Sequence, residues 1–411
     1  MYYTPDWCII RTDKNLKCEV KDLNRLVYAD NAATTKVSES VLNAMLPYFS
    51  ENYGNASSLY THGQNSKKAI NAAREPIAKL INAEPTEIFF TGSGTESDNM
   101  VIRGVLNSAA AKNKGKNHII TTKIEHPAIL RTCEAMQKQG FEVTYLDVDN
   151  NGVISLSQLE EAITEKTALI SVMAANNEIG SIQPLKEIGE IAKKHNVLFH
   201  TDAVQALGHM HIDVQEMNIS LMSLSAHKIH GPKGVGAIYI KKNVFPEPII
   251  TGGGQERNRR SGTENVPGIV GFGQAAQDMI DHMEEDNAHT AKLSKRLMEG
   301  LLEIKKSVLT GHPTNRLPGT CSFAFEAIEG ESMILMLNMK GICASTGSAC
   351  STGSLDPSHV LMAIGLTHQN AHGSLRLSIS KYTTEEDVEY IIESVKEVVA
   401  KLRAMSPVWH E

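Results

Sequence analysis

Seven short apolar runs, separated by stretches with helical patterns, lie between Ile88 and Ile240 and constrain the fold more than any other feature. Strands that alternate with helices at this spacing are typical of an α/β domain, whose mainly parallel sheet is covered by helices on both faces. Such sheets bind ligands at the carboxyl ends of their strands, so the residues that follow each run are candidates for a functional site. The runs are Ile88–Phe90, His118–Thr121, Val143–Leu146, Ala168–Val172, Val197–His200, Leu221–Leu224 and Ala237–Ile240.

After about residue 275 the pattern changes to long helical stretches with few strands. Glu284–Lys305 has a helical pattern. Thr384–Leu402 opens with Thr384 and Asp387 at the spacing of a capping box and continues with an apolar stripe. We therefore predict a large domain over residues 36–275 and a smaller α+β domain formed by residues 1–35 and 276–411.

The charge balance and the scattered cysteines exclude several classes of protein. Forty basic residues against 47 acidic ones give a net charge of −7, whereas nucleic-acid and anionic-membrane binders need a basic surface. Six scattered cysteines do not make a disulfide framework or a zinc ribbon, which favours a reducing compartment. No apolar run approaches the roughly 18 residues of a membrane span. Acidic residues near the start also argue against a transit peptide. We expect a cytoplasmic protein that binds neither nucleic acid nor membrane.

The loop Thr91–Asp98 follows the first strand and leads into a helical stretch. Its glycines allow the backbone to approach an anion closely, and Thr95 and Asp98 have capping-box spacing. Free N–H groups and the helix dipole would then converge where a phosphate could bind. A simple helix cap explains the same pattern, and the loop alone does not decide between the two interpretations.

An acid and an amine follow two consecutive strands. Asp202 comes after Val197–His200, and Lys228 comes after Leu221–Leu224, with one crossover between them. Both side chains are therefore expected at one edge of the sheet. A lysine that forms a Schiff base, a carboxylate that holds a pyridinium nitrogen and a phosphate loop together make a pyridoxal phosphate site. A structural Asp–Lys ion pair is the alternative that these two residues leave open.

Seven motifs, in the same order along the chain, resemble those of NifS/IscS-type cysteine desulfurases. The resemblance covers about residues 26 to 409 and implies the fold type I architecture of pyridoxal phosphate-dependent aminotransferases, with a mainly parallel seven-stranded sheet in the large, cofactor-binding domain and a smaller α+β domain. The motifs are Asp30-Asn31-Ala32-Ala33-Thr34-Thr35, Gly94-Thr95-Glu96-Ser97-Asp98-Asn99, Glu125-His126-Pro127, Asn176-Asn177-Glu178-Ile179-Gly180, Ser225-Ala226-His227-Lys228, Arg259-Arg260-Ser261-Gly262-Thr263-Glu264-Asn265 and Gly347-Ser348-Ala349-Cys350.

The resemblance implies roles for individual residues. Lys228 would be the Schiff-base lysine, and Asp202 the partner of the pyridine nitrogen. His126 would stack on the ring and shuttle protons, with a helix-capping surface histidine as the alternative. Asn177 and Arg376 would bind the substrate, Arg376 through its carboxylate. The implied cofactor-binding set is Gly94, Thr95, His126, Asn177, Asp202, Gln205, Ser225, His227 and Lys228, with Thr263 contributed by the second subunit of a homodimer.

Cys350 is the candidate nucleophile. It lies in Ser345–Ser354, a run of small polar residues that favours an exposed loop and a reactive thiol. Cys343, by contrast, is predicted to lie in a strand. The resemblance implies an enzyme that removes sulfur from L-cysteine, gives L-alanine and leaves a persulfide on Cys350. The sulfur would pass to an acceptor protein such as an iron–sulfur scaffold, for iron–sulfur cluster or other sulfur-cofactor assembly.

Two other functions fit part of the sequence. A selenocysteine lyase on the same fold would need no persulfide, and the Cys350 loop argues against it. A sulfur carrier or scaffold with a vestigial cofactor site is disfavoured because Lys228, Asp202 and His126 are all present. Asp147–Gly152 imitates a calcium loop, but Gln158 stands where the bidentate glutamate belongs, and we predict no metal site.

Overall fold

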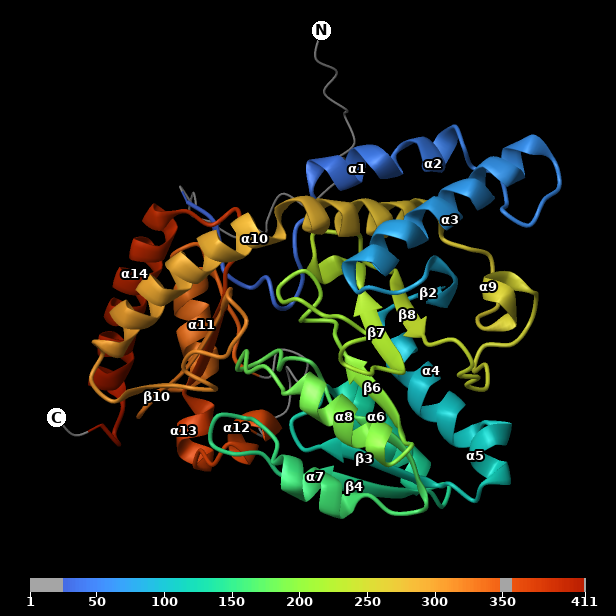
Figure 1. The fold of residues 1–411 in the computed structure, drawn as a ribbon. Helices are drawn as coiled ribbons and strands as arrows, with labels where there is room; N and C mark the ends of the chain where they lie inside the picture. The colour runs from blue at the N-terminus through green and yellow to red at the C-terminus, as the bar shows by residue number, and fades with distance from the viewer. Residues whose placement is uncertain (1–24, 348–356, 410–411) are drawn as a thin grey trace, which may run out of the picture.

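The computed structural model describes residues 25–347 and 357–409. Its centre is a seven-stranded sheet in the order β2-β8-β7-β6-β5-β3-β4, in which β8 runs antiparallel to β2 and β7 and the other pairs are parallel (Figure 1). The mainly parallel α/β fold is therefore confirmed, and each predicted strand forms with ends that shift by one or two residues. The strands are β2 Ile88–Thr91, β3 His118–Thr122, β4 Glu142–Leu146, β5 Thr167–Ser171, β6 Leu198–Asp202, β7 Leu221–Ser225 and β8 Gly236–Ile240.

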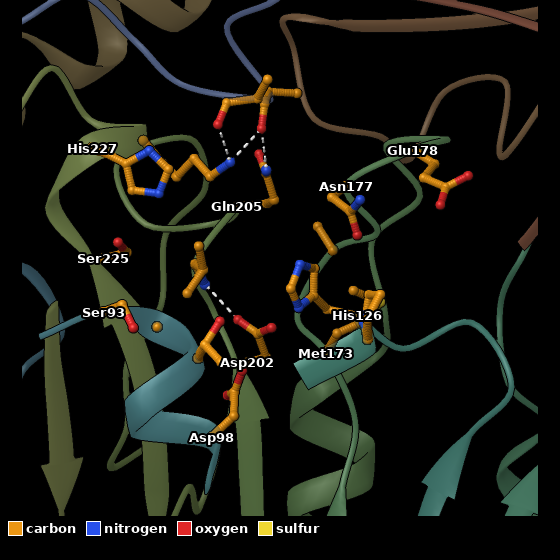
Figure 2. A pocket seen from close by; sticks show the side chains of 18 of the residues that line it. Ser93, Asp98, His126, Met173, Asn177, Glu178, Asp202, Gln205, Ser225 and His227 are labelled. Atoms are coloured by element: carbon orange, nitrogen blue, oxygen red, sulfur yellow. Dashed lines mark hydrogen bonds between the residues drawn. The ribbon is translucent and has the colours of Figure 1, made fainter. Parts of the chain in front are cut away.

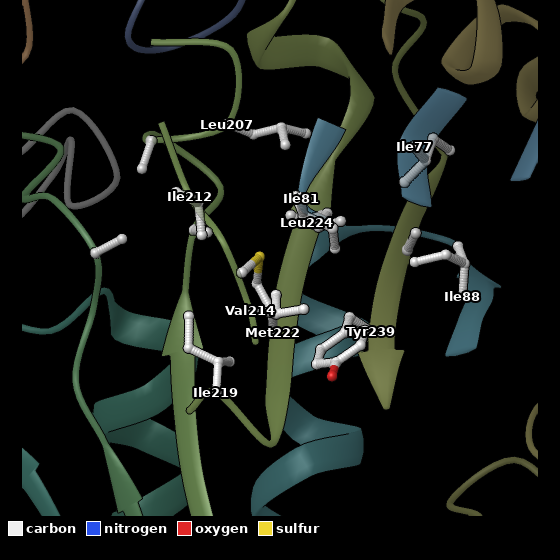
Figure 3. Packing of buried hydrophobic residues seen from close by; sticks show 14 of the residues in the cluster. Ile77, Ile81, Ile88, Leu207, Ile212, Val214, Ile219, Met222, Leu224 and Tyr239 are labelled. Carbon is white, nitrogen blue, oxygen red and sulfur yellow. The ribbon is translucent and has the colours of Figure 1, made fainter. Parts of the chain in front are cut away.

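Alternating side chains of the strands pack on two faces of this sheet. On β7, Leu221 belongs to the apolar cluster that includes residues of α4 and α6, whereas Met222 belongs to the cluster that includes α3 and the first part of α10. Figure 3 shows this second cluster, in which Met222 and Tyr239 lie near Ile81. The period of two follows from strand geometry, and burial on both faces explains why the strands have almost no polar side.

A second core lies beside the first. It is built on a three-stranded antiparallel sheet in the order β12-β10-β9, whose strands are Ser374–Ser378, Thr320–Phe325 and Ser307–Leu309. The predicted capping box opens α14 (Glu385–Met405), since Asp387 N donates to Thr384 Oγ1 and Thr384 N donates to Asp387 Oδ2, each at 3.1 Å. A short strand, β1 (Val27–Tyr28), pairs in parallel with β11 (Ile342–Cys343), so Cys343 is a strand residue as predicted.

The predicted start of the helix at Glu284 is wrong, because α10 runs without interruption over Val266–Leu302. Glycines in its first half weaken the local helical signal. They are needed for packing, since a Cβ at Gly273 would lie 2.7 Å from the Cα of Ala73 on α3. The same helix contributes Phe272 to the first core and Leu297 to the second. The predicted boundary at residues 275–276 thus falls inside a helix, and the division into two domains stays a prediction.

The remaining helices surround these two cores, and no helix within 25–347 or 357–409 is long and apolar enough to cross a lipid bilayer. They are α1 Glu39–Met45, α2 Pro47–Ser50, α3 Thr61–Leu80, α4 Gly94–Asn107, α5 Ala109–Asn113, α6 Pro127–Gln137, α7 Leu156–Ala162, α8 Leu185–Lys194, α9 Gln255–Asn258, α11 Gly330–Asn338, α12 His359–Ala363 and α13 His368–His372, with 3-10 turns η1 Pro85–Glu87 and η2 Ala226–Lys228.

We predict that Gly189→Ala on α8 destabilises the fold. An added Cβ would lie 1.8 Å from the carbonyl oxygen of Met217, so the backbone must move, at a cost of about 1–3 kcal/mol. The midpoint of thermal unfolding should fall measurably. Glu190→Ala, at the exposed neighbouring position, is the control and should leave the midpoint unchanged. Equal midpoints for the two variants would contradict this account of the packing.

Candidate active site

A cavity of about 490 Å³ lies at the carboxyl ends of the parallel strands (Figure 2). It is a size typical of small-molecule sites. Thr263 is exposed and does not line it, and Cys350 lies outside the described residues. The other candidate residues all line this cavity: Gly94, Thr95, His126, Asn177, Asp202, Gln205, Ser225, His227, Lys228 and Arg376.

The N-terminus of α4 faces the cavity, but its cap differs from the prediction. Ser93 is the N-cap residue, and its Oγ accepts a hydrogen bond from Glu96 N at 3.1 Å. The predicted pair Thr95 and Asp98 is wrong because the helix begins at Gly94, which puts Thr95 inside the first turn and Asp98 in the buried interior. The first N–H groups of the helix have no intrahelical partners, so together with the dipole they can bind an anion in the cavity.

Asp202 and Asp98 are two buried carboxyl groups of the cavity wall. Burial raises the pKa of Asp202, whereas His126, the Val204 N–H and Lys228 lower it. Burial and the nearby Asp202 raise the pKa of Asp98 well above its usual range. Within the described residues, Asp98 Oδ1 has no hydrogen-bond partner. Burial therefore opposes the ionised form of both carboxyl groups, and His126 and Lys228 act against this effect at Asp202.

Lys228 lies in η2, directly after β7, and extends toward the N-terminal segment. Its Nζ donates to the carbonyl oxygens of Ala32 and, at 2.9 Å, Ala33. Gln205 Nε2 donates to the same Ala32 oxygen at 2.8 Å (Figure 2). The turn at residues 30–33 thus orients two predicted site residues. The sequence shows the motif that forms this turn, but it does not show that the turn binds Lys228 and Gln205. No local pattern indicates a contact with residues almost two hundred positions away.

His126 both caps a helix and lines the cavity, so neither sequence interpretation excludes the other. It is the N-cap of α6, with Pro127 as the first helical residue. Its Nδ1 accepts a hydrogen bond from Ala128 N at 3.1 Å. Because an amide N–H can only donate, the ring proton of the neutral imidazole is on Nε2. Burial lowers the pKa of this imidazole, with Asp202 acting in the opposite direction.

Arg376 reaches the cavity from β12 in the second core. The residue is 2% exposed; its Nη1 donates to Asn177 O at 3.0 Å, and its Nη2 donates to Asp30 Oδ1 at 2.9 Å. Its Nε has no hydrogen-bond partner within the described residues. A buried guanidinium with an unused donor at a cavity wall is suited to bind a ligand carboxylate.

Several polar residues around the cavity were not identified from the sequence. Glu178 and His359 line it, and Glu125 lies buried beside it. Burial raises the pKa of Glu125 to about 8, although the Met173 N–H and Thr122 hydroxyl bonds act in the opposite direction. The available signal was an acidic residue inside a motif that follows a strand, as for Glu125 after β3 and Glu178 after β5.

The residues present fit pyridoxal phosphate. A helix N-terminus and the side chains of Ser225 and His227 can bind a phosphate, Asp202 can face a ring nitrogen, and Lys228 supplies the amine. Burial lowers the pKa of His227 to about 4, so this imidazole is neutral at neutral pH. In the part of the chain that the structure describes, no three His, Cys, Asp or Glu side chains are grouped to hold a metal ion.

The chain is similar to known proteins over nearly its full length. The family model described as aminotransferase class-V matches residues 27–391. A protein of Methanosarcina thermophila named cysteine desulfurase IscS is 57% identical over 384 residues, which are 93% of this chain and 94% of that protein. A solved NifS-like protein has a TM-score of 0.86 and 41% identity over 92% of this chain and 100% of its own. A structure named SspA in complex with cysteine has a TM-score of 0.77 and 37% identity, and covers 87% and 100%.

We predict that Glu125 makes stability depend on pH. Since its pKa in the folded state is about 8, above the value of an unfolded chain, the folded state binds a proton that the unfolded state releases. Stability should therefore fall as the pH rises from about 4.5 toward 8. Glu125→Gln stays neutral and should weaken this dependence, measured as the unfolding midpoint at pH 6 and pH 8. An unchanged pH dependence would show that Glu125 does not hold the proton.

Proposed function

The chain belongs to the class-V aminotransferase family and is a pyridoxal phosphate-dependent cysteine desulfurase, and we propose that Lys228, His126 and Cys350 carry out its reaction. Such an enzyme removes the sulfur of L-cysteine and leaves L-alanine. One observation carries the assignment of roles. A single cavity is lined by a lysine, a carboxylate, an imidazole and an arginine, each of which lies in a different strand or follows one.

The cofactor would be held by residues that already converge on this cavity. Lys228 would bind it covalently, Asp202 would face the ring nitrogen, and the α4 N-terminus with Ser225 and His227 would bind the phosphate. Asn177 and Gln205 would lie near its phenolic oxygen. When bound, pyridoxal phosphate supplies an electron sink conjugated to the amino group of the substrate.

The chain's own groups would orient the substrate and move its protons. Arg376 is fixed by Asn177 O and Asp30, and would bind the cysteine carboxylate through N–H groups that these two bonds leave unused, the Nε group among them. His126 can exchange protons with a ligand only at Nε2, because Nδ1 is occupied by the Ala128 N–H. This supports His126 as the group that holds or releases a proton in the cavity.

Cys350 would receive the sulfur. Its thiolate would attack the substrate sulfur, so that a Cys350 S–S bond forms while the C–S bond of the substrate breaks and its electron pair stays with the carbon fragment. Support comes from the small polar residues around Cys350 and from Gly347, which lines the cavity just before this segment. The persulfide would then pass its sulfur to an acceptor protein such as an iron–sulfur scaffold. The cytoplasmic location predicted from the sequence stays a prediction.

The homodimer is supported by an exposed apolar surface. Leu59 is 94% exposed, and Thr263 is exposed on a nearby loop whose preceding residues, Glu256–Asn258, have positive φ angles. Glu256 is nevertheless fixed by a buried ion pair with Arg74, at 2.5 Å. A second cavity lined by residues of α3 and of 254–264 connects the two regions. A second copy would cover this surface and receive Thr263 in its own cavity. The exposed apolar side chains are Leu42, Leu46, Phe49, Tyr53, Leu59 and Tyr60.

We predict that Cys350→Ser binds the cofactor and still shows a spectral change with L-cysteine, yet releases no alanine. A serine hydroxyl stays protonated at neutral pH and attacks divalent sulfur poorly. The measurement follows the cofactor spectrum and alanine in the same sample. Cys343→Ser is the matched control, because Cys343 lies in β11 and its pKa is raised by burial, and it should retain activity. Alanine release at the parental rate by Cys350→Ser would exclude Cys350 as the nucleophile.

We also predict that the parent sediments as a dimer and that Leu46→Glu with Phe49→Glu makes it monomeric and inactive. Two charges on this surface would be buried without partners in the dimer. Sedimentation velocity and cofactor content report the two effects. Leu335→Glu, at a similarly exposed position on α11, should change neither. A fully active parental monomer would refute the proposal.

A further inference from the structure

Two buried side chains connect the cavity wall to the first turn of α12. Ser358 Oγ donates a hydrogen bond to Glu178 Oε2, and the two residues are 4% and 5% exposed. The same Ser358 oxygen caps α12, because it accepts from Val360 N at 3.1 Å and Leu361 N at 3.3 Å. The Ser358 hydroxyl thus donates to Glu178 and accepts from the backbone of α12.

The Glu178 carboxylate also lies against Gly347, on the other side of residues 348–356. A Cβ at position 347 would be 2.7 Å from Glu178 Oε2, so a larger residue there would require the carboxylate to move. Gly347 is in turn placed by its neighbour Ser345, which exchanges backbone hydrogen bonds with Arg376 at 3.2 and 2.7 Å. One carboxylate therefore contacts the chain on both sides of the segment that contains Cys350.

The turn that carries Glu178 is rigidly built. Asn176 Oδ1 accepts from Glu178 N at 2.8 Å and from Ile179 N at 3.0 Å, while its Nδ2 donates to Ile124 O at 2.8 Å. The intervening residue, Asn177, lines the cavity, and its carbonyl oxygen accepts from Arg376. The position of Glu178 is thus coupled to that of the arginine expected to bind the substrate.

The fold of α12 does not depend on Glu178 alone. Val360, Leu361 and Ile364 pack in an apolar cluster with Ile124 and Ile179. In addition, His359 Nε2 lies 3.0 Å from the carbonyl oxygen of Glu125 and donates to it. The contacts of Glu178 are therefore not needed to keep α12 folded. We infer that they fix the position of Ser358 and Gly347 relative to the cavity. Burial raises the pKa of Glu178 to about 7, so glutamine is a close substitute for its protonated form.

We propose that Glu178 is a positioning residue for sulfur transfer: by fixing Gly347 and Ser358, it sets where the Cys350 thiol can act relative to Arg376 and the cavity. The inference rests on the proposed role of Cys350. Cys350 follows Gly347 by three residues, a length of chain that spans at most about 11 Å. If Gly347 moves, the volume that the Cys350 thiol can reach moves with it. Sulfur transfer requires alignment of the reacting atoms, whereas none of the residues proposed to hold the cofactor lies between Gly347 and Ser358.

The test compares Glu178→Ala with Glu178→Gln and Ser358→Ala with Ser358→Thr in the full-length enzyme loaded with its cofactor. The alanine variants should lower kcat for alanine release about 10- to 100-fold, while cofactor content and the spectral response to L-cysteine stay at parental values. The conservative variants should retain activity within about threefold, because each keeps the hydrogen bond. The double variant Glu178→Ala with Ser358→Ala should be no slower than the slower single variant, since both remove one contact.

Two control variants separate this effect from general damage. Glu87→Gln alters a buried carboxylate far from the cavity, which accepts from Lys242 N at 2.7 Å, and Ser155→Ala removes the serine cap of α7. Both should retain parental kcat. A parental kcat in Glu178→Ala, or the loss of its spectral response together with activity, would overturn the positioning role. Alanine release by Cys350→Ser would instead refute the proposed nucleophile, whatever Glu178→Ala does.

Discussion

Parallel pairing of β3, β5, β6 and β7 is the constraint on which the site depends, because it brings four carboxyl ends to one edge of the sheet. Each end delivers one polar group: His126 after β3, Asn177 after β5, Asp202 at the end of β6 and Lys228 after β7. In an antiparallel arrangement, successive strand ends would face opposite edges, and these side chains could not share a cavity. The parallel direction of these strands is therefore what allows the four side chains to line one cavity.

Burial opposes the ionisation of the acidic groups around the cavity. Desolvation raises the pKa of Asp98, Glu125 and Glu178, each of which lies within or beside the cavity wall. Desolvation raises the pKa of Asp202 as well, whereas His126, a backbone N–H and Lys228 act in the opposite direction. Several carboxyl groups can thus coexist near one cofactor site, since most of them need not be charged at the same time.

The second core contributes polar groups to the cavity, and these buried groups need hydrogen-bond partners of their own. Arg376 is almost fully buried, and a buried guanidinium requires acceptors. It finds them in Asn177 O, after β5, and in Asp30, at the N-terminal turn, and its Nε has no hydrogen-bond partner within the described residues. From the C-terminal part of the chain, Ser358 donates a hydrogen bond to Glu178, and Gly347 lies close to the same carboxylate. Arg376, Ser358 and Gly347 therefore all contact the turn that carries Asn177 and Glu178.

The sequence by itself determined the features that depend on neighbours along the chain. Seven strands and the capping box of α14 follow from periodicity and capping chemistry, and the order of strands placed Asp202 near Lys228. Local pattern was wrong at the start of α4, where Ser93 rather than Thr95 is the cap, and at the start of α10, where glycines needed for packing weaken the helical signal. The contacts of Arg376 with Asp30 and of Ser358 with Glu178 join residues 346 and 180 positions apart. Only the tertiary structure decided these, because no periodicity relates such distant residues and each bond forms only where packing removes the competing water.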